Sequence, residues 1–104
     1  MIGDLRIGSS YALIIDESGR ESGNSVYIGG GTVEGWNSKR VVVRERDYSK
    51  IYDERGRETG SMIWLGDGRS IKAVTQSAIL VQEGSYVRRF SIDGRDTGEM
   101  TFMG

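Results

Sequence analysis

One five-residue motif, Gly-Arg-acid-(Ser/Thr)-Gly, occurs three times along this chain. Its copies begin at Gly19, Gly56 and Gly94, so the motif recurs after 37 and then 38 residues. A sequence period between roughly 20 and 50 residues is typical of a repeated supersecondary unit. The spacing therefore predicts a single domain, 1–104, built from about three similar units. We place these units at approximately 1–32, 33–69 and 70–104.

The residues between the copies of the motif are typical of short β-strands. Gly is frequent at 16 residues, Pro is absent, and β-branched and aromatic residues form short runs bounded by polar residues. No segment shows a 3.6-residue periodicity over the length of a helix, so we expect an all-β fold without helices. The third unit has four such runs, which predict strands at 71–74, 78–82, 86–92 and 97–103. We expect the second unit to follow the same order, whereas the first unit lacks the run that would open it.

Three all-β folds use four-stranded units of this length: the β-propeller, the β-prism of small lectins and the β-trefoil. Val41–Val43 and Met62–Leu65 are continuous apolar runs, and such runs predict strands that are covered on both faces. Propeller blades pack on both faces, whereas a prism sheet exposes one face to solvent. The pattern therefore favours propeller blades, with the prism and the trefoil as alternatives.

The order of the predicted elements also resembles a known family. An inner strand, a second strand, a tight turn, a strand with aromatic and acidic residues and a glycine turn together resemble the generic blade of WD-type β-propellers. The resemblance covers the chain well from about Gly35 to Met103 and extends in part to the first 30 residues. The hallmark Trp-Asp dipeptide does not occur, and Tyr52-Asp53 takes its place in the second unit only. The resemblance implies a blade-like repeat and no particular activity.

A propeller needs roughly four to eight blades to close around its axis. Three units are too few, so we expect a homo-oligomer in which several chains complete one ring. A dimer is the simplest such arrangement, and closed rotational symmetry is the common solution for soluble homo-oligomers. The strand missing from the first unit would then lie at the junction between chains, where a partner covers free strand edges.

The composition excludes several kinds of chemistry. The chain has 14 Lys and Arg residues against 15 Asp and Glu residues, which argues against binding to nucleic acid or to an anionic membrane. Cys and His are absent, which removes disulfides, thiol chemistry, the common transition-metal ligands and the usual side chain for proton transfer. We therefore expect no enzyme, cofactor or metal site. The sequence shows no signal peptide or membrane-spanning apolar run, so we expect a cytoplasmic protein.

The arginines of the three motifs are the first candidates for a binding site. Arg20, Arg57 and Arg95 are each followed by an acidic residue, and three equivalent pairs would suit an anion or a sugar. The alternative is a charged hairpin whose ion pairs face water and whose glycines are explained by turn chemistry alone. We favour the hairpin and keep the three arginines as candidate binding residues.

Aromatic residues form the second group of candidates. Tyr27, Trp64 and Phe102 lie at equivalent positions within apolar runs, which favours packing in the core or at an interface over stacking on a sugar ring. Trp36 is different, because its neighbours are polar and the third unit has no aromatic counterpart. Trp36 and the adjacent Asn37 are therefore the best candidates for a binding contact, with packing as an equal alternative for Trp36.

Together these patterns predict a non-catalytic binding or structural module that self-assembles into a closed, propeller-like ring. Its expected partners are further copies of the same chain and a carbohydrate or protein ligand. The alternative function is a lectin-like carbohydrate-binding protein, with shallow sites that use Trp36, the motif arginines and acidic side chains.

Overall fold

A computed structural model describes residues 1–103, which form eleven strands in three antiparallel sheets and no helix. Gly104, the last residue of the third predicted unit, lies outside the described residues. Sheet A contains β1 (Ile2–Ile7), β2 (Tyr11–Asp16) and β3 (Glu21–Tyr27). Sheet B contains β4 (Thr32–Trp36), β5 (Arg40–Glu45), β6 (Tyr48–Asp53) and β7 (Glu58–Trp64). Sheet C contains β8 (Arg69–Val74), β9 (Ala78–Glu83), β10 (Tyr86–Ser91) and β11 (Asp96–Phe102).

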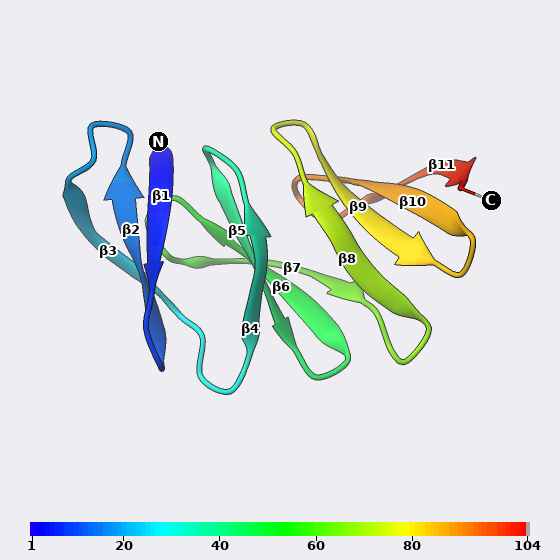
Figure 1. Ribbon diagram of the computed structural model, residues 1–104, viewed down its shortest axis with the longest axis horizontal. Helices are drawn as coiled ribbons and strands as arrows, with labels where there is room; N and C mark the ends of the chain where they lie inside the picture. Colours follow the sequence, from blue (N-terminus) through cyan, green and yellow to red (C-terminus); the bar gives the residue numbers. More distant parts are fainter. Residues whose placement is uncertain (104) are drawn as a thin grey trace.

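The three sheets lie side by side along the long axis of the molecule, with sheet B in the middle (Figure 1). In each sheet, strands that follow one another in the sequence are neighbours, because short turns join antiparallel partners. The expectation of an all-β fold is confirmed, and so is the order of the four strands predicted for 71–103. Within the described residues, sheet A has three strands and no counterpart of β4 or β8.

The three sheets share the same strand register. At one position the paired residues are Leu5 with Ile14, Val42 with Ile51, and Leu80 with Arg89. At a second position they are Ala12 with Val26, Ser49 with Ile63, and Val87 with Thr101. Residues at matching positions of this register can therefore be compared directly between sheets.

Two hydrophobic clusters hold the sheets together. The first lies between sheets A and B and consists of Ile2, Ala12, Ile14, Val26, Ile28, Val41, Val43 and Tyr52. The second lies between sheets B and C and consists of Val42, Ile51, Ile63, Leu65, Ile79, Val81 and Phe90. Full burial of one aliphatic or aromatic side chain contributes roughly 1.5–3 kcal/mol, so these clusters are the main attraction between the sheets.

Sheet B is covered on both faces at β5, as its continuous apolar run predicts. Val41 and Val43 belong to the first cluster and Val42 to the second, because alternate residues of a strand point to opposite faces. The same expectation is wrong for Met62–Leu65. Ile63 and Leu65 are buried but Met62 and Trp64 are exposed, since β7 is an edge strand and no neighbouring sheet covers its second face there.

The first strands of sheets B and C come close together. β4 is in contact with β8, and a Cβ atom at Gly35 of β4 would lie only 2.7 Å from Cγ2 of Val74 in β8. Glycine is required for this close approach of two strands, because any side chain would force them apart. The stacked sheets therefore converge at β4 and β8.

Candidate functional site

The three copies of the sequence motif form tight turns with the same hydrogen bonds. The turns join β2 to β3, β6 to β7, and β10 to β11. In each turn, a side chain three residues before the first motif glycine accepts a hydrogen bond from the backbone N–H of the motif arginine. These bonds run from Arg20 to Asp16 (3.1 Å), from Arg57 to Asp53 (3.0 Å) and from Arg95 to Ser91 (3.2 Å). The motif is therefore a capped turn in all three places.

Both glycines of each motif have a backbone conformation that other residues rarely adopt. Their φ angles lie between 81° and 89° in all three copies. The first glycine lies in the turn, and the second lies where the register of the following strand shifts. Turn and bulge geometry thus account for the glycines of the motif, which favours the hairpin interpretation over a ligand site.

The turn carboxylates are held in their charged form. The hydroxyl of Ser18 and the backbone N–H of Arg20 donate to Asp16 and lower its pKa. Burial acts in the opposite direction at Asp53, but hydrogen bonds from the backbone N–H groups of Arg57 and Arg55 outweigh it and lower the pKa of Asp53. The turn geometry therefore favours the ionised side chain at both positions.

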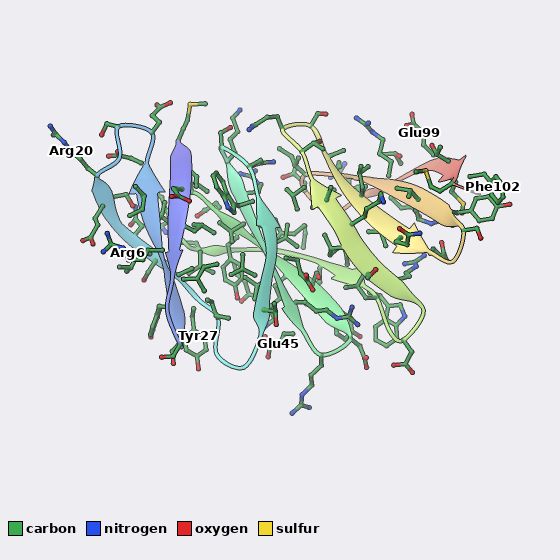
Figure 2. All side chains as sticks on the ribbon, in the orientation of Figure 1. Arg6, Arg20, Tyr27, Glu45, Glu99 and Phe102 are labelled. Carbon is green, nitrogen blue, oxygen red and sulfur yellow. The ribbon has the colours of Figure 1, made fainter. Side chains whose placement is uncertain are left out.

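The side chains of the three motif arginines are exposed, and they belong to turns of three different sheets. Figure 2 shows Arg20 pointing away from the protein. The acidic residues that follow these arginines pair with other side chains: Glu21 with Arg6 (2.8 Å), Glu58 with Lys50 (3.6 Å) and Asp96 with Arg88 (2.9 Å). The acidic residues of the motifs therefore pair with cations outside the motif, because successive side chains of an extended chain point to opposite faces.

Trp36 and Asn37, the best binding candidates from the sequence, lie where the sheets meet. Trp36 is half-buried and packs against the first hydrophobic cluster. Asn37 is only 2% exposed; its Nδ2 donates to the backbone C=O of Thr75, in the loop between β8 and β9, at 2.8 Å. Its Oδ1 accepts hydrogen bonds from the backbone N–H groups of Lys39 and Arg40. These contacts favour a structural role for both residues.

Three aromatic residues that the sequence assigned to packing are on the surface. Tyr27, Trp64 and Phe102 are 59%, 52% and 63% exposed. Each lies against a tyrosine of the neighbouring strand, with ring centroids 5.2, 4.8 and 5.3 Å apart. We call these the aromatic pairs: Tyr11–Tyr27, Tyr48–Trp64 and Tyr86–Phe102.

Of the two expectations for these rings, packing in the core is wrong because of strand alternation, whereas packing at an interface between chains stays a prediction. Val26 and Ile63 point into the clusters, so the adjacent Tyr27 and Trp64 point to the other face. Strand alternation assigns Tyr27 and Trp64 to one face, but only the structure shows that this face is exposed at both positions. The rings of Tyr27 and Trp64 also cover Gly29 and Gly66, which have positive φ angles. A Cβ atom at Gly29 would lie 3.0 Å from the ring of Tyr27, and one at Gly66 would lie 3.3 Å from the ring of Trp64.

In sheet B, a lysine between two carboxylates lies beside the aromatic pair. Nζ of Lys50 is 3.0 Å from a carboxylate oxygen of Glu45 and 3.6 Å from one of Glu58. The hydrogen bond to Glu45 raises the pKa of Lys50, so the side chain is charged at neutral pH. A shallow hollow of about 360 Å³ is lined by Glu45, Arg46, Asp47, Tyr48, Lys50 and Met62. An aromatic ring and charged donors and acceptors thus meet in one place.

Sheet C has the same arrangement at matching positions of the register. Arg88 takes the place of Lys50 and lies 3.2 Å from Glu83 and 2.9 Å from Asp96. Its hydrogen bond lowers the pKa of Glu83. In sheet A the matching residue is the apolar Leu13, so two of the three aromatic pairs have a cation between carboxylates beside them.

In the part of the chain that the structure describes, nothing covers the outer faces of sheets A and C, and each face is hollowed. The hollow on sheet A has a volume of about 430 Å³ and is lined in part by Asp4, Arg6 and Ile15. The hollow on sheet C has a volume of about 280 Å³, and its lining includes Arg89 and Thr101. Arg6 and Glu99, which belong to these two faces, lie at opposite ends of the molecule in Figure 2.

Comparison of this chain with known protein families, with curated proteins and with solved structures finds no match. Residues 1–103 contain no group of three or more acidic, Cys or His side chains arranged to hold a metal ion. The same residues include no helix with the length and hydrophobicity that a membrane span needs. The function must therefore be argued from the turns, the aromatic pairs and the two outer faces.

Proposed function

We propose that this protein is a non-catalytic binding or structural module that self-assembles into a closed, β-propeller-like ring. One observation carries the proposal: sheet B is packed on both faces by sheets with its own strand register. The outer faces of sheets A and C lack such a neighbour in the described residues. The packing that joins the three sheets can therefore continue at both ends of the molecule.

The packing of the sheets supports blades over the alternatives. A propeller blade contacts a neighbour on each face, and Val41–Val43 make such contacts on both faces of sheet B. The first strands of sheets B and C converge at Gly35 and Val74, as the innermost strands of blades would. Two chains with three sheets each would supply six blades, within the usual range of about four to eight.

The ionisable groups support a role without catalysis. Cys and His are absent from the sequence. The pKa values of Asp16, Asp53 and Glu83 are lowered, and that of Lys50 is raised, so each moves away from neutral pH. A general acid or base works best with a pKa near the working pH, and these groups are shifted in the opposite sense.

The mass of the protein in solution tests the proposal. We expect light scattering coupled to size-exclusion chromatography to give the mass of two chains of 11.5 kDa each. A single-chain mass that persists across a series of protein concentrations would contradict self-assembly.

Carbohydrate binding is a second candidate function, favoured by the aromatic pairs of sheets B and C. Each pair offers a flat apolar ring beside a cation and two carboxylates, which could stack on a sugar ring and hydrogen-bond its hydroxyls. We expect Trp64→Ala to weaken binding on a glycan array, and Trp64→Ala combined with Phe102→Ala to remove it. Tyr27→Ala is the matched control, because its pair has Leu13 in place of the cation. A protein that binds no glycan at millimolar concentration would exclude this function.

A further inference from the structure

Each of the two interfaces joins one face of a sheet to the opposite face of the next. We call the face toward the following sheet the forward face, and the other the back face. The forward face of sheet A presents Leu5, Ile14 and Val26. At the matching register positions, the forward face of sheet B presents Val42, Ile51 and Ile63. The back face of sheet B presents Val41, Val43 and Tyr52, and the back face of sheet C presents Ile79, Val81 and Phe90 at the matching positions. The two interfaces are therefore built from the same positions.

A motif turn of the following sheet closes each interface. A Cβ atom at Gly56, in the turn of sheet B, would collide with the backbone C=O of Ser25 in sheet A. A Cβ atom at Gly94, in the turn of sheet C, would lie 2.8 Å from Cδ1 of Ile51 in sheet B. At Gly19, the matching residue of sheet A, nothing among the described residues lies within 4 Å. The turn of sheet A thus has the same form without the neighbour that the other two turns have.

The forward face of sheet C has one charged and one polar residue at places that are apolar inside the stack. Arg89 matches Ile51 of sheet B, and Thr101 matches Ile63. Arg89 is partly exposed, and Glu99 lies 3.7 Å from it. Leu80 and Val87 keep the apolar character of the face and line the hollow together with Arg89.

The back face of sheet A has the complementary pattern. Asp4 and Arg6 match Val41 and Val43 of sheet B, while Ile15 stays apolar at the place of Tyr52. Asp16 and Glu17, in the adjoining turn, line the same hollow. This face is therefore mostly acidic around an apolar residue, with one arginine.

We propose that the forward face of sheet C docks on the back face of sheet A in a second copy of this chain. The inference rests on the proposed function and specifies which surfaces meet in the ring. If Gly19 lies on the partner as Gly94 lies on Ile51, it comes next to the partner subunit's Arg89. The acidic turn of sheet A then faces a guanidinium group, and opposite charges favour this docking. Contact between two C faces would bring two copies of Arg89 together, and like charges oppose it.

Pairing through unlike faces also explains how the assembly closes. An interface between two different surfaces of the same protein generates a ring when the rotation between copies closes. Each copy then uses one C face and one A face, so neither outer face is left in solvent.

Engineered disulfides test the docking, because the chain has no cysteine of its own. A Cβ atom at Gly94 would lie 3.3 Å from Cβ of Ser61, so Gly94→Cys with Ser61→Cys is the positive control for a bond within one chain. The matching pair between chains is Gly19→Cys on one copy and Glu99→Cys on another. We expect a covalent dimer when the two single variants are mixed and oxidised, and none from either variant alone.

The outcomes separate this inference from the proposed function. Covalent dimers from Gly19→Cys alone, or no disulfide in a protein that still has the mass of two chains, would overturn the docking and leave self-assembly standing. A single-chain mass for the unaltered protein would overturn both. Because cysteine at Gly19 adopts a strained backbone, the docking also needs a test that leaves the turn intact.

Charge reversal at Arg89 provides that second test. We expect Arg89→Glu to raise the dissociation constant of the dimer by about tenfold or more, because it places like charges at the interface. Asp4→Lys combined with Arg89→Glu should recover most of the loss. Arg46→Glu, in the turn between β5 and β6, makes the same change of charge away from both faces and should leave the constant unchanged. Equal effects of Arg89→Glu and Arg46→Glu would overturn the docking.

Discussion

Asp16, Asp53 and Ser91 hold three turns in the same shape by different chemistry. Each side-chain oxygen accepts the backbone N–H of a motif arginine, but only the two aspartates are charged. Hydrogen bonds to a carboxylate favour its ionised form in the folded state. At the scale of single residues, two turns therefore depend on pH and the third does not.

We expect Asp53→Asn to weaken the dependence of stability on acid. The folded pKa of Asp53 is lowered relative to the unfolded value near 3.9. The contribution of ionised Asp53 to the free energy of unfolding is therefore complete above that pH. It is lost as the pH falls through the folded pKa. Asn keeps an oxygen acceptor but cannot titrate, so urea unfolding between pH 6 and pH 3 should show a smaller loss of stability than in the unaltered protein.

Ser91→Ala is the control for this change. It removes the corresponding hydrogen bond at a position without charge, so we expect a loss of about 1 kcal/mol that is the same at both pH values. Identical pH profiles for Asp53→Asn and the unaltered protein would contradict the assignment.

The turns also act at the scale of elements, because they pack one sheet on the next. Gly56 has φ of 81° and Gly60 has φ of 89°, so alanine would be strained at either position. A Cβ atom at Gly56 would collide with Ser25 of sheet A, while nothing lies within 4 Å of the same atom at Gly60. The two glycines of one motif thus separate backbone strain from packing between sheets.

We expect Gly56→Ala to destabilise the protein more than Gly60→Ala. Strain at a positive φ costs about 1–2 kcal/mol in both variants. The collision with β3 adds a further cost at Gly56 alone, and the difference between the two free energies of unfolding measures it. Equal losses in chemical denaturation would contradict the packing of this turn against sheet A.

The whole molecule depends on sheet B, which contributes residues to both hydrophobic clusters. Val41 belongs to the first cluster and Val42 to the second, and both are fully buried. Because one strand supports both interfaces, loss of either cluster exposes a face of the central sheet. We therefore expect the described part of the chain to unfold as one unit.

Val41→Ala and Val42→Ala test this cooperativity. Each removes apolar atoms from a different cluster, and we expect each to lower the free energy of unfolding by about 2 kcal/mol. Fluorescence of the two tryptophans, Trp36 and Trp64, and far-ultraviolet circular dichroism should report the same single transition in both variants. Separate transitions from the two probes would show that the clusters unfold independently.

Local features of this protein were predictable because local chemistry determines them. The all-β character, the strand order within 71–103 and the three turns all follow from glycine positions, β-forming runs and the absence of helical periodicity. A glycine with positive φ marks a turn or a bulge in whichever fold contains it. A continuous apolar run correctly predicted two covered faces for Val41–Val43, which lie in an inner strand, but not for Met62–Leu65 in the edge strand β7.

By itself, the sequence determined where this chain turns and where it is extended. Only the tertiary structure decided which side chains are covered, because burial depends on the sheet that lies opposite. Trp64 is exposed although its run is apolar, and Asn37 is buried although its neighbours are polar. The acidic residues of the motifs find their cations on another strand of the same sheet, a contact set by the register of the strands. The repeated motif specifies three similar turns, whereas the surface that each turn meets is a property of the stacked sheets.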